Sequence, residues 1–199
     1  MKKSLLTMTA AVALVGAMGA GATLAYFSAQ TEAVTNKFTF AQTGIAITLE
    51  EHAYVQETNS LDTTKEVLAN TYDLLVPGMT VPKDPYVTVN KGSVDCYVVV
   101  EVVNDNAGVV SNVAFDTKNW TKLEGEEIGT SYWRYNEKVT RNADVDQVLP
   151  AVFTEVTFND EITAANTEIK DIVITAAATQ AQEREEAEAI DAAFDMLKK

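Results

Sequence analysis

Cysteine and histidine are nearly absent from this sequence, and each shortage excludes a class of protein. The chain has one cysteine, Cys96, so no disulfide can form within it. Cys96 begins an apolar run, which favours a buried small side chain over a reactive thiol. The one histidine, His52, excludes a His-Glu-x-x-His zinc motif, and nothing around it resembles the nucleophile of a triad. We therefore interpret Glu50-Glu51-His52 as a surface loop rather than a cation site, and expect no catalytic residue, metal or cofactor.

Basic residues are also scarce. Lysine and arginine number 15 against 29 acidic residues, which gives a net charge of −14 and a pI near 4.4. Removal of a leader containing Lys2 and Lys3 would make the remaining chain −16. An acidic surface disfavours nucleic acids and anionic lipid heads as partners.

The first 25 residues have the pattern of a cleavable secretory signal. Lys2 and Lys3 precede an apolar stretch from Leu5 to Ala22, and Thr23-Leu24-Ala25 offers small side chains for cleavage between Ala25 and Tyr26. The alternative is an uncleaved anchor helix, which the length permits but the Gly- and Ala-rich centre disfavours. No cysteine lies near the cleavage site, so a lipoprotein is excluded. We expect a secreted protein that meets the membrane only before cleavage.

The rest of the chain predicts an extended arm over residues 26–43, a β-domain over 44–180 and a C-terminal helix over 181–199. Phe38-Thr39-Phe40 alternates within the arm as a strand would. Alternating or β-branched runs predict strands at 45–50, 86–90, 95–103, 131–136, 152–158 and 172–178. Residues 51–71 read as a long loop with a helical turn near 65–69. Many short strands between turns favour an all-β, antiparallel β-sandwich resembling a jelly roll.

The spacing of apolar residues changes from that of a strand to that of a helix after Ala181. Strong helix formers fill residues 182–189, and Ile190, Ala193, Phe194 and Leu197 then recur on one helical face. Lys198 and Lys199 stand at the end where positive charge suits the helix dipole. The pattern predicts an amphipathic helix that packs on the sandwich or meets a partner.

Three further patterns each allow a functional and a structural interpretation. Asn104-Asp105-Asn106 with Asp116 offers oxygen ligands for calcium, but the spacing does not fit an EF-hand and a turn is favoured. Asn119-Trp120-Thr121 matches a glycosylation sequon, for which we favour no role. Four aromatic residues suit either a sugar-binding platform or the core and cross-strand pairs, of which the second is favoured: Trp120, Tyr132, Trp133 and Tyr135.

Several blocks together resemble the TasA/camelysin family of bacterial biofilm-matrix proteins. Leu24-Ala25-Tyr26-Phe27-Ser28 resembles export segments cut by a SipW-type signal peptidase. The stretch from Pro77 to Pro85, followed by Val87 to Ser93, is similar to the family's block of Pro-Gly, Lys-Asp-Pro and alternating valines. Residues 172–180 resemble its closing strand.

The resemblance implies a jelly-roll subunit that polymerises into extracellular fibres, each subunit donating an N-terminal strand to the next. On this chain the donor would be the arm, with Phe27, Phe38 and Phe40 as its aromatic residues. Self-association and processing by the signal peptidase would be its interactions. Two alternatives remain: a cell-surface module that binds wall glycan or a host protein, and a camelysin-like metalloendopeptidase, which the single histidine disfavours.

Overall fold

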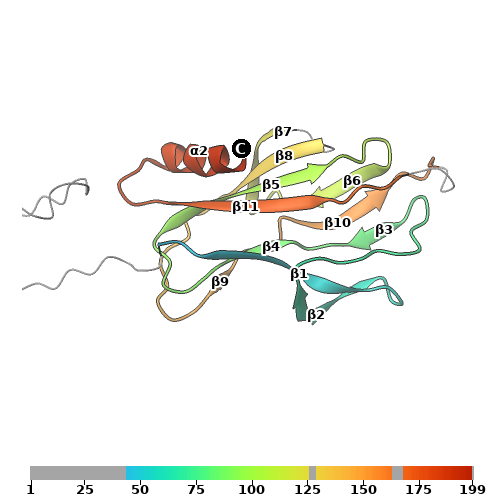
Figure 1. The fold of residues 1–199 in the computed structure, drawn as a ribbon, viewed down its shortest axis with the longest axis horizontal. Helices are drawn as coiled ribbons and strands as arrows, with labels where there is room; N and C mark the ends of the chain where they lie inside the picture. The colour runs from blue at the N-terminus through green and yellow to red at the C-terminus, as the bar shows by residue number, and fades with distance from the viewer. Residues whose placement is uncertain (1–43, 126–128, 163–167, 199) are drawn as a thin grey trace, which may run out of the picture. The chain divides into compact units, whose positions relative to one another are not determined.

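A computed structural model describes residues 44–125, 129–162 and 168–198, so the predicted signal and arm lie outside the described residues. The described chain consists of antiparallel strands followed by a helix (Figure 1). The predicted antiparallel β-sandwich with a C-terminal helix is confirmed. The elements are β1 (Ile47–Val55), β2 (Ser60–Val67), β3 (Thr80–Pro82), β4 (Tyr86–Val89), β5 (Cys96–Asn104), β6 (Val110–Phe115), β7 (Trp120–Gly125), β8 (Gly129–Tyr135), β9 (Gln147–Val148), β10 (Phe153–Phe158), β11 (Val173–Gln180) and α2 (Glu186–Leu197).

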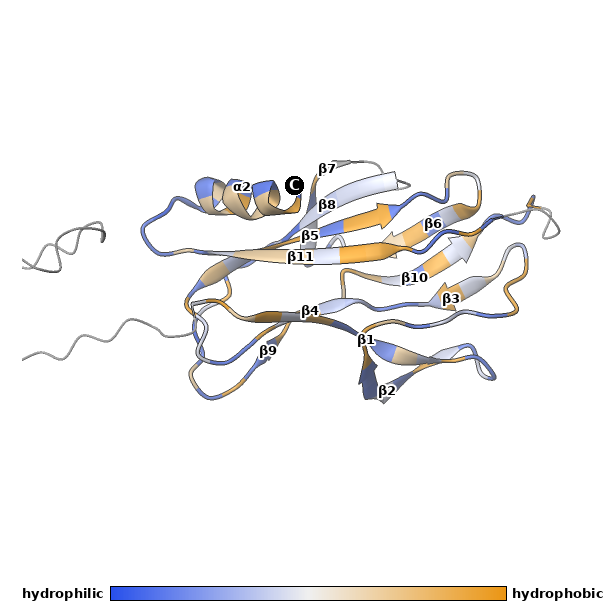
Figure 2. Ribbon diagram, viewed as in Figure 1, coloured by the Kyte–Doolittle hydropathy of each residue, from blue (hydrophilic) through white to orange (hydrophobic). Residues whose placement is uncertain are grey.

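The strands form three sheets with the orders β2-β1-β4-β9, β3-β10-β6 and β11-β5-β8-β7. Side chains from all three sheets share one core, whose largest fully buried members include Trp120, Phe153 and Val87. Hydrophobic residues are concentrated on parts of β5, β6 and β11, whereas β2 and the connection before α2 are hydrophilic (Figure 2).

Strand β5 is buried on both faces, which explains its nearly continuous apolar sequence. Cys96, Val98 and Val100 point into the main core, and each is 0% exposed. Val99 points to the opposite face, where α2 covers it together with Ala177 of β11. The predicted burial of Cys96 is confirmed.

Helix α2 packs its predicted apolar face on β5 and β11, with Ile190 and Ala193 buried. The Phe194 ring meets the ring of Tyr132 edge to face, with centroids 4.8 Å apart. The helix begins at Glu186, not at Ala181 as predicted, because Glu183 adopts a left-handed φ of 59° and Glu185 is extended. Lys198 lies at the C-cap with its Nζ 4.1 Å from the Phe194 ring centroid.

The predicted loop over residues 51–71, with its helical turn, is wrong. Strand β1 continues to Val55, and β2 returns beside it after a turn over 56–59. Strand β2 is polar and largely exposed at the edge of its sheet, so it lacks the apolar alternation on which the prediction depended. Strand β6 was also missed, because only part of its Val110–Phe115 sequence alternates.

Candidate functional site: an open seam between β1 and β11

Strand β11 has one bonded edge and one open edge. It pairs with β5 from Val173 opposite Val103 to Gln180 opposite Cys96, and Ala181 N donates to Asp95 O at 2.8 Å in the same register. Bonded pairs alternate along an antiparallel ladder. Alternate residues of β11 therefore direct their N–H and C=O groups away from β5: Ile174, Ala176, Ala178 and Gln180. No strand among the described residues pairs with the edge that these groups form.

The beginning of β1 has a matching open edge. Asn90 N donates to Ala46 O at 2.9 Å, and Ile47 lies opposite Val89 in the same ladder with β4. By the same alternation, the N–H and C=O groups of Ile47 and Leu49 point away from β4. Strand β2 covers this edge of β1 only from Glu51 onward.

We call the space between these two edges the seam. Apolar side chains along the seam pack on the core but remain partly exposed: Ile45, Ile47, Leu49, Ile172, Ile174, Ala176 and Ala178. Strands β1 and β11 contact each other without forming a ladder. The seam thus offers unpaired backbone groups above an apolar floor, the two features that bind an added strand.

A groove of about 650 Å³ lies where the seam meets the start of β11. One wall is Leu49 to Glu51 of β1 with the β2–β3 connection, and the other is the stretch from Ile169 to Ile174. Its floor comes from β3, β6 and β10, including Val81, Val110 and Val156. The lining is mainly apolar, which suits a peptide side chain more than a charged small molecule.

Two charges are buried in this groove. Lys83 Nζ lies 2.5 Å from Glu51 Oε2, and the side chains are only 11% and 5% exposed. The ring of Tyr72 lies beside them, with its centroid 5.8 Å from Lys83 Nζ and its hydroxyl donating to Pro82 O at 3.1 Å. Burial first, and then the charges of Glu51 and Asp84, raise the pKa of Tyr72, so the phenol stays neutral.

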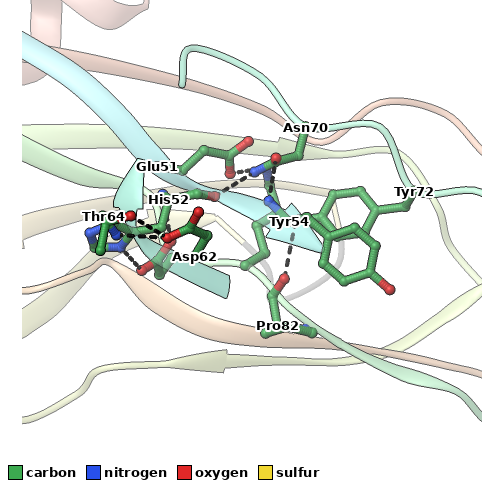
Figure 3. A network of polar contacts seen from close by, with 10 residues as sticks. Glu51, His52, Tyr54, Asp62, Thr64, Asn70, Tyr72 and Pro82 are labelled. Carbon is green, nitrogen blue, oxygen red and sulfur yellow. Dashed lines mark hydrogen bonds and ion pairs between the residues drawn. The ribbon is translucent and has the colours of Figure 1, made fainter. Parts of the chain in front are cut away.

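After Glu50, where the pairing of β1 with β4 ends, side chains bond the backbone of β1 in place of a strand (Figure 3). The Asn70 amide donates to His52 O at 2.8 Å and accepts from Tyr54 N at 2.7 Å. The Asp84 carboxylate accepts from His52 N at 3.0 Å and contacts His52 Nδ1 at 2.6 Å. By the alternation along β1, these contacts serve the edge that β4 covers only as far as Glu50, which is opposite the edge where Ile47 and Leu49 are open. Within the described ranges, no side chain serves the backbone of Ile47 or Leu49.

The predicted ligand candidates are engaged in internal contacts. His52 pairs with Asp84 and lies on a strand, so its interpretation as a loop residue is wrong. The Asn106 amide donates to Asn104 Oδ1 and to Lys170 O, and its oxygen accepts from Lys170 N. The favoured turn fits Asp116, which accepts bonds from Lys118 N and Asn119; the Asn119 amide lowers its pKa most. Among the described residues, no group of three or more His, Cys, Asp or Glu side chains could hold a metal ion.

The four aromatic residues do not form a platform on the surface, the alternative that the sequence disfavoured. Trp120 is 0% exposed and donates from Nε1 to Pro150 O at 3.0 Å. Trp133 is also buried, donates to Ser131 Oγ and stacks on Phe115. Tyr135 packs against Trp120, and Tyr132 against the helix. The structural interpretation is therefore the right one for these aromatic residues.

No helix within the described residues is long and apolar enough to span a membrane.

Comparison with known proteins does not identify a family. No protein-family model matches the chain, and no curated protein matches it. A crystal structure of a cohesin–dockerin complex contains a chain that is 14% identical, with a TM-score of 0.35 over 56% of this chain and 84% of that one. So loose an overlap identifies neither a relative nor a partner, and the function must be argued from the seam.

Proposed function

We propose that this chain is a secreted structural protein of the extracellular matrix that assembles into fibres by strand addition, as its resemblance to the TasA/camelysin family implies. The arm over residues 26–43, freed by cleavage after Ala25, would enter the seam of another copy. The observation that carries the proposal is the pair of open edges on β1 and β11 above partly exposed apolar side chains.

The arm has the length and chemistry that the seam requires. At about 3.4 Å per residue its 18 residues extend to roughly 60 Å, more than twice the length of an eight-residue strand such as β11. Val34, Phe38 and Phe40 fall on one face of an extended chain. Glu32 and Lys37 balance each other and the amino group freed by cleavage adds a positive charge, so the arm avoids the repulsion that two strongly acidic bodies exert on each other.

A synthetic arm peptide tests the proposal directly. A chain of residues 44–199 keeps all the residues of the two core clusters that the structure describes. We expect this body to bind a labelled peptide of residues 26–43, measured by fluorescence anisotropy, and a peptide with Phe38→Asp and Phe40→Asp to bind at least about tenfold more weakly. Equal binding of both peptides, or of neither, would refute the proposal.

A proline substitution on β11 tests where the peptide binds. The N–H of Ala176 points into the seam, so Ala176→Pro keeps the ladder with β5 and places a ring where an added strand would lie. We expect a folded body with peptide affinity reduced at least about tenfold, because both a backbone bond and the space for the strand are lost. Thr175→Pro is the matched control. Its N–H faces β5, so this variant should lose stability instead.

A further inference from the structure

Large exposed hydrophobic side chains gather at two places on the body. Four belong to the connections that border the groove and one is the first residue of β11, and we call them the groove rim: Leu68, Leu74, Val76, Ile169 and Val173. Two more, which we call the β9 knob, are Val145 and Val148, at 60% and 64% exposure. Grouped exposed apolar residues mark contact surfaces more often than isolated ones do.

The groove rim is held in place by its neighbours. Leu74 adopts a left-handed φ of 57°, a strained conformation for a bulky residue, and is 83% exposed. Tyr72 and Leu75 of the same connection pack on the core and anchor it. On the opposite wall, both backbone groups of Lys170, next to Ile169, are bonded by the Asn106 amide. The exposed Leu74 therefore lies between two residues that are anchored on the core.

The β9 knob is also fixed by polar contacts. Asn142 Oδ1 accepts from Asp144 N at 3.0 Å and from Val145 N at 3.1 Å, forming a tight turn. Asp146 Oδ1 accepts from Lys91 N at 2.7 Å. These contacts fix the turn that presents Val145 to solvent.

The two patches lie at opposite ends of the body, and the first described residue, Gly44, lies at the end that carries the knob. Figure 1 shows β9 and the start of β1 at one end, and the start of β11 and the β2–β3 connection at the other. Gly44, which follows the arm, accepts from Val94 N at 3.1 Å, while Gly92 N donates to Asn142 O at 2.7 Å. The first described residue and the knob therefore share one end.

We propose that the β9 knob of one copy packs on the groove rim of the next copy, so that the bodies contact each other head to tail. This inference rests in part on the proposed function, because an arm that enters a neighbour's groove carries its own knob to that groove's rim. Two different patches are joined, so the contact is heterologous and can repeat along a filament without closing. The second copy is thus the partner that covers both apolar patches.

Paired cysteine variants test this contact between chains of residues 26–199. We expect mixed Leu74→Cys and Val145→Cys chains to form disulfide-linked dimers on oxidation, while neither variant alone does so. Cys96 is fully buried and cannot compete. Leu123→Cys, on the edge strand β7, is the control that should not link to Val145→Cys. Linkage within either single variant, or none in the mixture, would overturn the head-to-tail contact.

A second measurement separates this inference from the proposed function. Val145→Lys with Val148→Lys should raise the concentration needed for fibre assembly about tenfold, because the contact loses the two valines that it would bury. Binding of the arm peptide to the body should not change, and Leu123→Lys should assemble normally. If the peptide binds but the double variant assembles at the original concentration, the knob contact is wrong. If the peptide itself does not bind, the strand-addition proposal fails instead.

Discussion

The buried ion pair in the groove gives the sharpest prediction about stability. Replacing Lys83 by Met keeps most of the side-chain volume but leaves the Glu51 carboxylate, only 5% exposed, without its partner. Breaking one side of a buried ion pair costs about 3–5 kcal/mol. We therefore expect Lys83→Met to lower the free energy of unfolding by about that amount, which corresponds to roughly 6–20 °C in Tm for a body of this size.

Urea unfolding at pH 7 measures this loss through the fluorescence of the buried Trp120 and Trp133. The double variant Glu51→Leu with Lys83→Met should recover most of the stability, because replacing both charges by apolar groups removes the unpaired carboxylate. Lys138→Met is the matched control, since the Lys138–Asp95 pair is exposed at 44% and 26% and separated by 3.5 Å. It should cost less than about 1 kcal/mol. A Lys83→Met loss as small as the control's would show that water screens the groove pair and would refute the reasoning.

Three further predictions concern pH, the helix and salt. Burial raises the pKa of Cys96 from 9.0 to about 11, and burial with the Glu66 contact raises the pKa of Tyr86 from 10.0 to about 12. The unfolded chain ionises first, so the free energy of unfolding should fall as the pH rises from about 9 to 12, as alkaline urea titrations would measure. Ile190→Ala should lower the free energy of unfolding by about 2–4 kcal/mol in the same assay, because Ile190 is buried between α2 and the sheet. The control Met196→Ala, at an exposed position of the same helix, should change it little. Fibre assembly should become stronger as the salt concentration rises from 0.01 to 0.15 M, because salt screens the repulsion between the acidic bodies. Light scattering would measure it, and weaker assembly at the higher salt concentration would mean that charge attraction drives the contact.

The elements that the sequence predicted are those in which each face is either covered by the core or left in solvent. Strand β5 has an apolar residue at nearly every position because both faces are covered, and α2 has an apolar stripe because one face is. Strand β2 escaped prediction because none of its residues joins the core clusters, so its Ser60–Val67 sequence is mostly polar and does not alternate. Its pairing depends on its connection to β1 by a short turn, which hydrophobic periodicity does not reveal.

The seam was beyond sequence reasoning for a different reason. Whether Ile47 or Ala176 has a backbone partner depends on which distant strands share a ladder, and side-chain pattern reports burial rather than pairing. One indication was available: the alternation of Ala176 and Ala178 in the closing strand leaves less side-chain volume on the core side than the valines of β5 do. The burial of Glu51 and Lys83 had no indication, since both stand among polar residues.

The open edge of β1 follows from the point at which β2 leaves it. Val67 lies opposite Glu51, so a longer β2 would have placed Leu68 and Ala69 beside Glu50 and Leu49 and covered the seam. Leu68 instead turns away and is 85% exposed. Leaving peptide groups unpaired beside an apolar floor costs stability, to the degree that water cannot reach them. A fold that keeps this arrangement gains by accepting a strand from outside, and the leucine that left the sheet becomes part of the rim where the next body would dock.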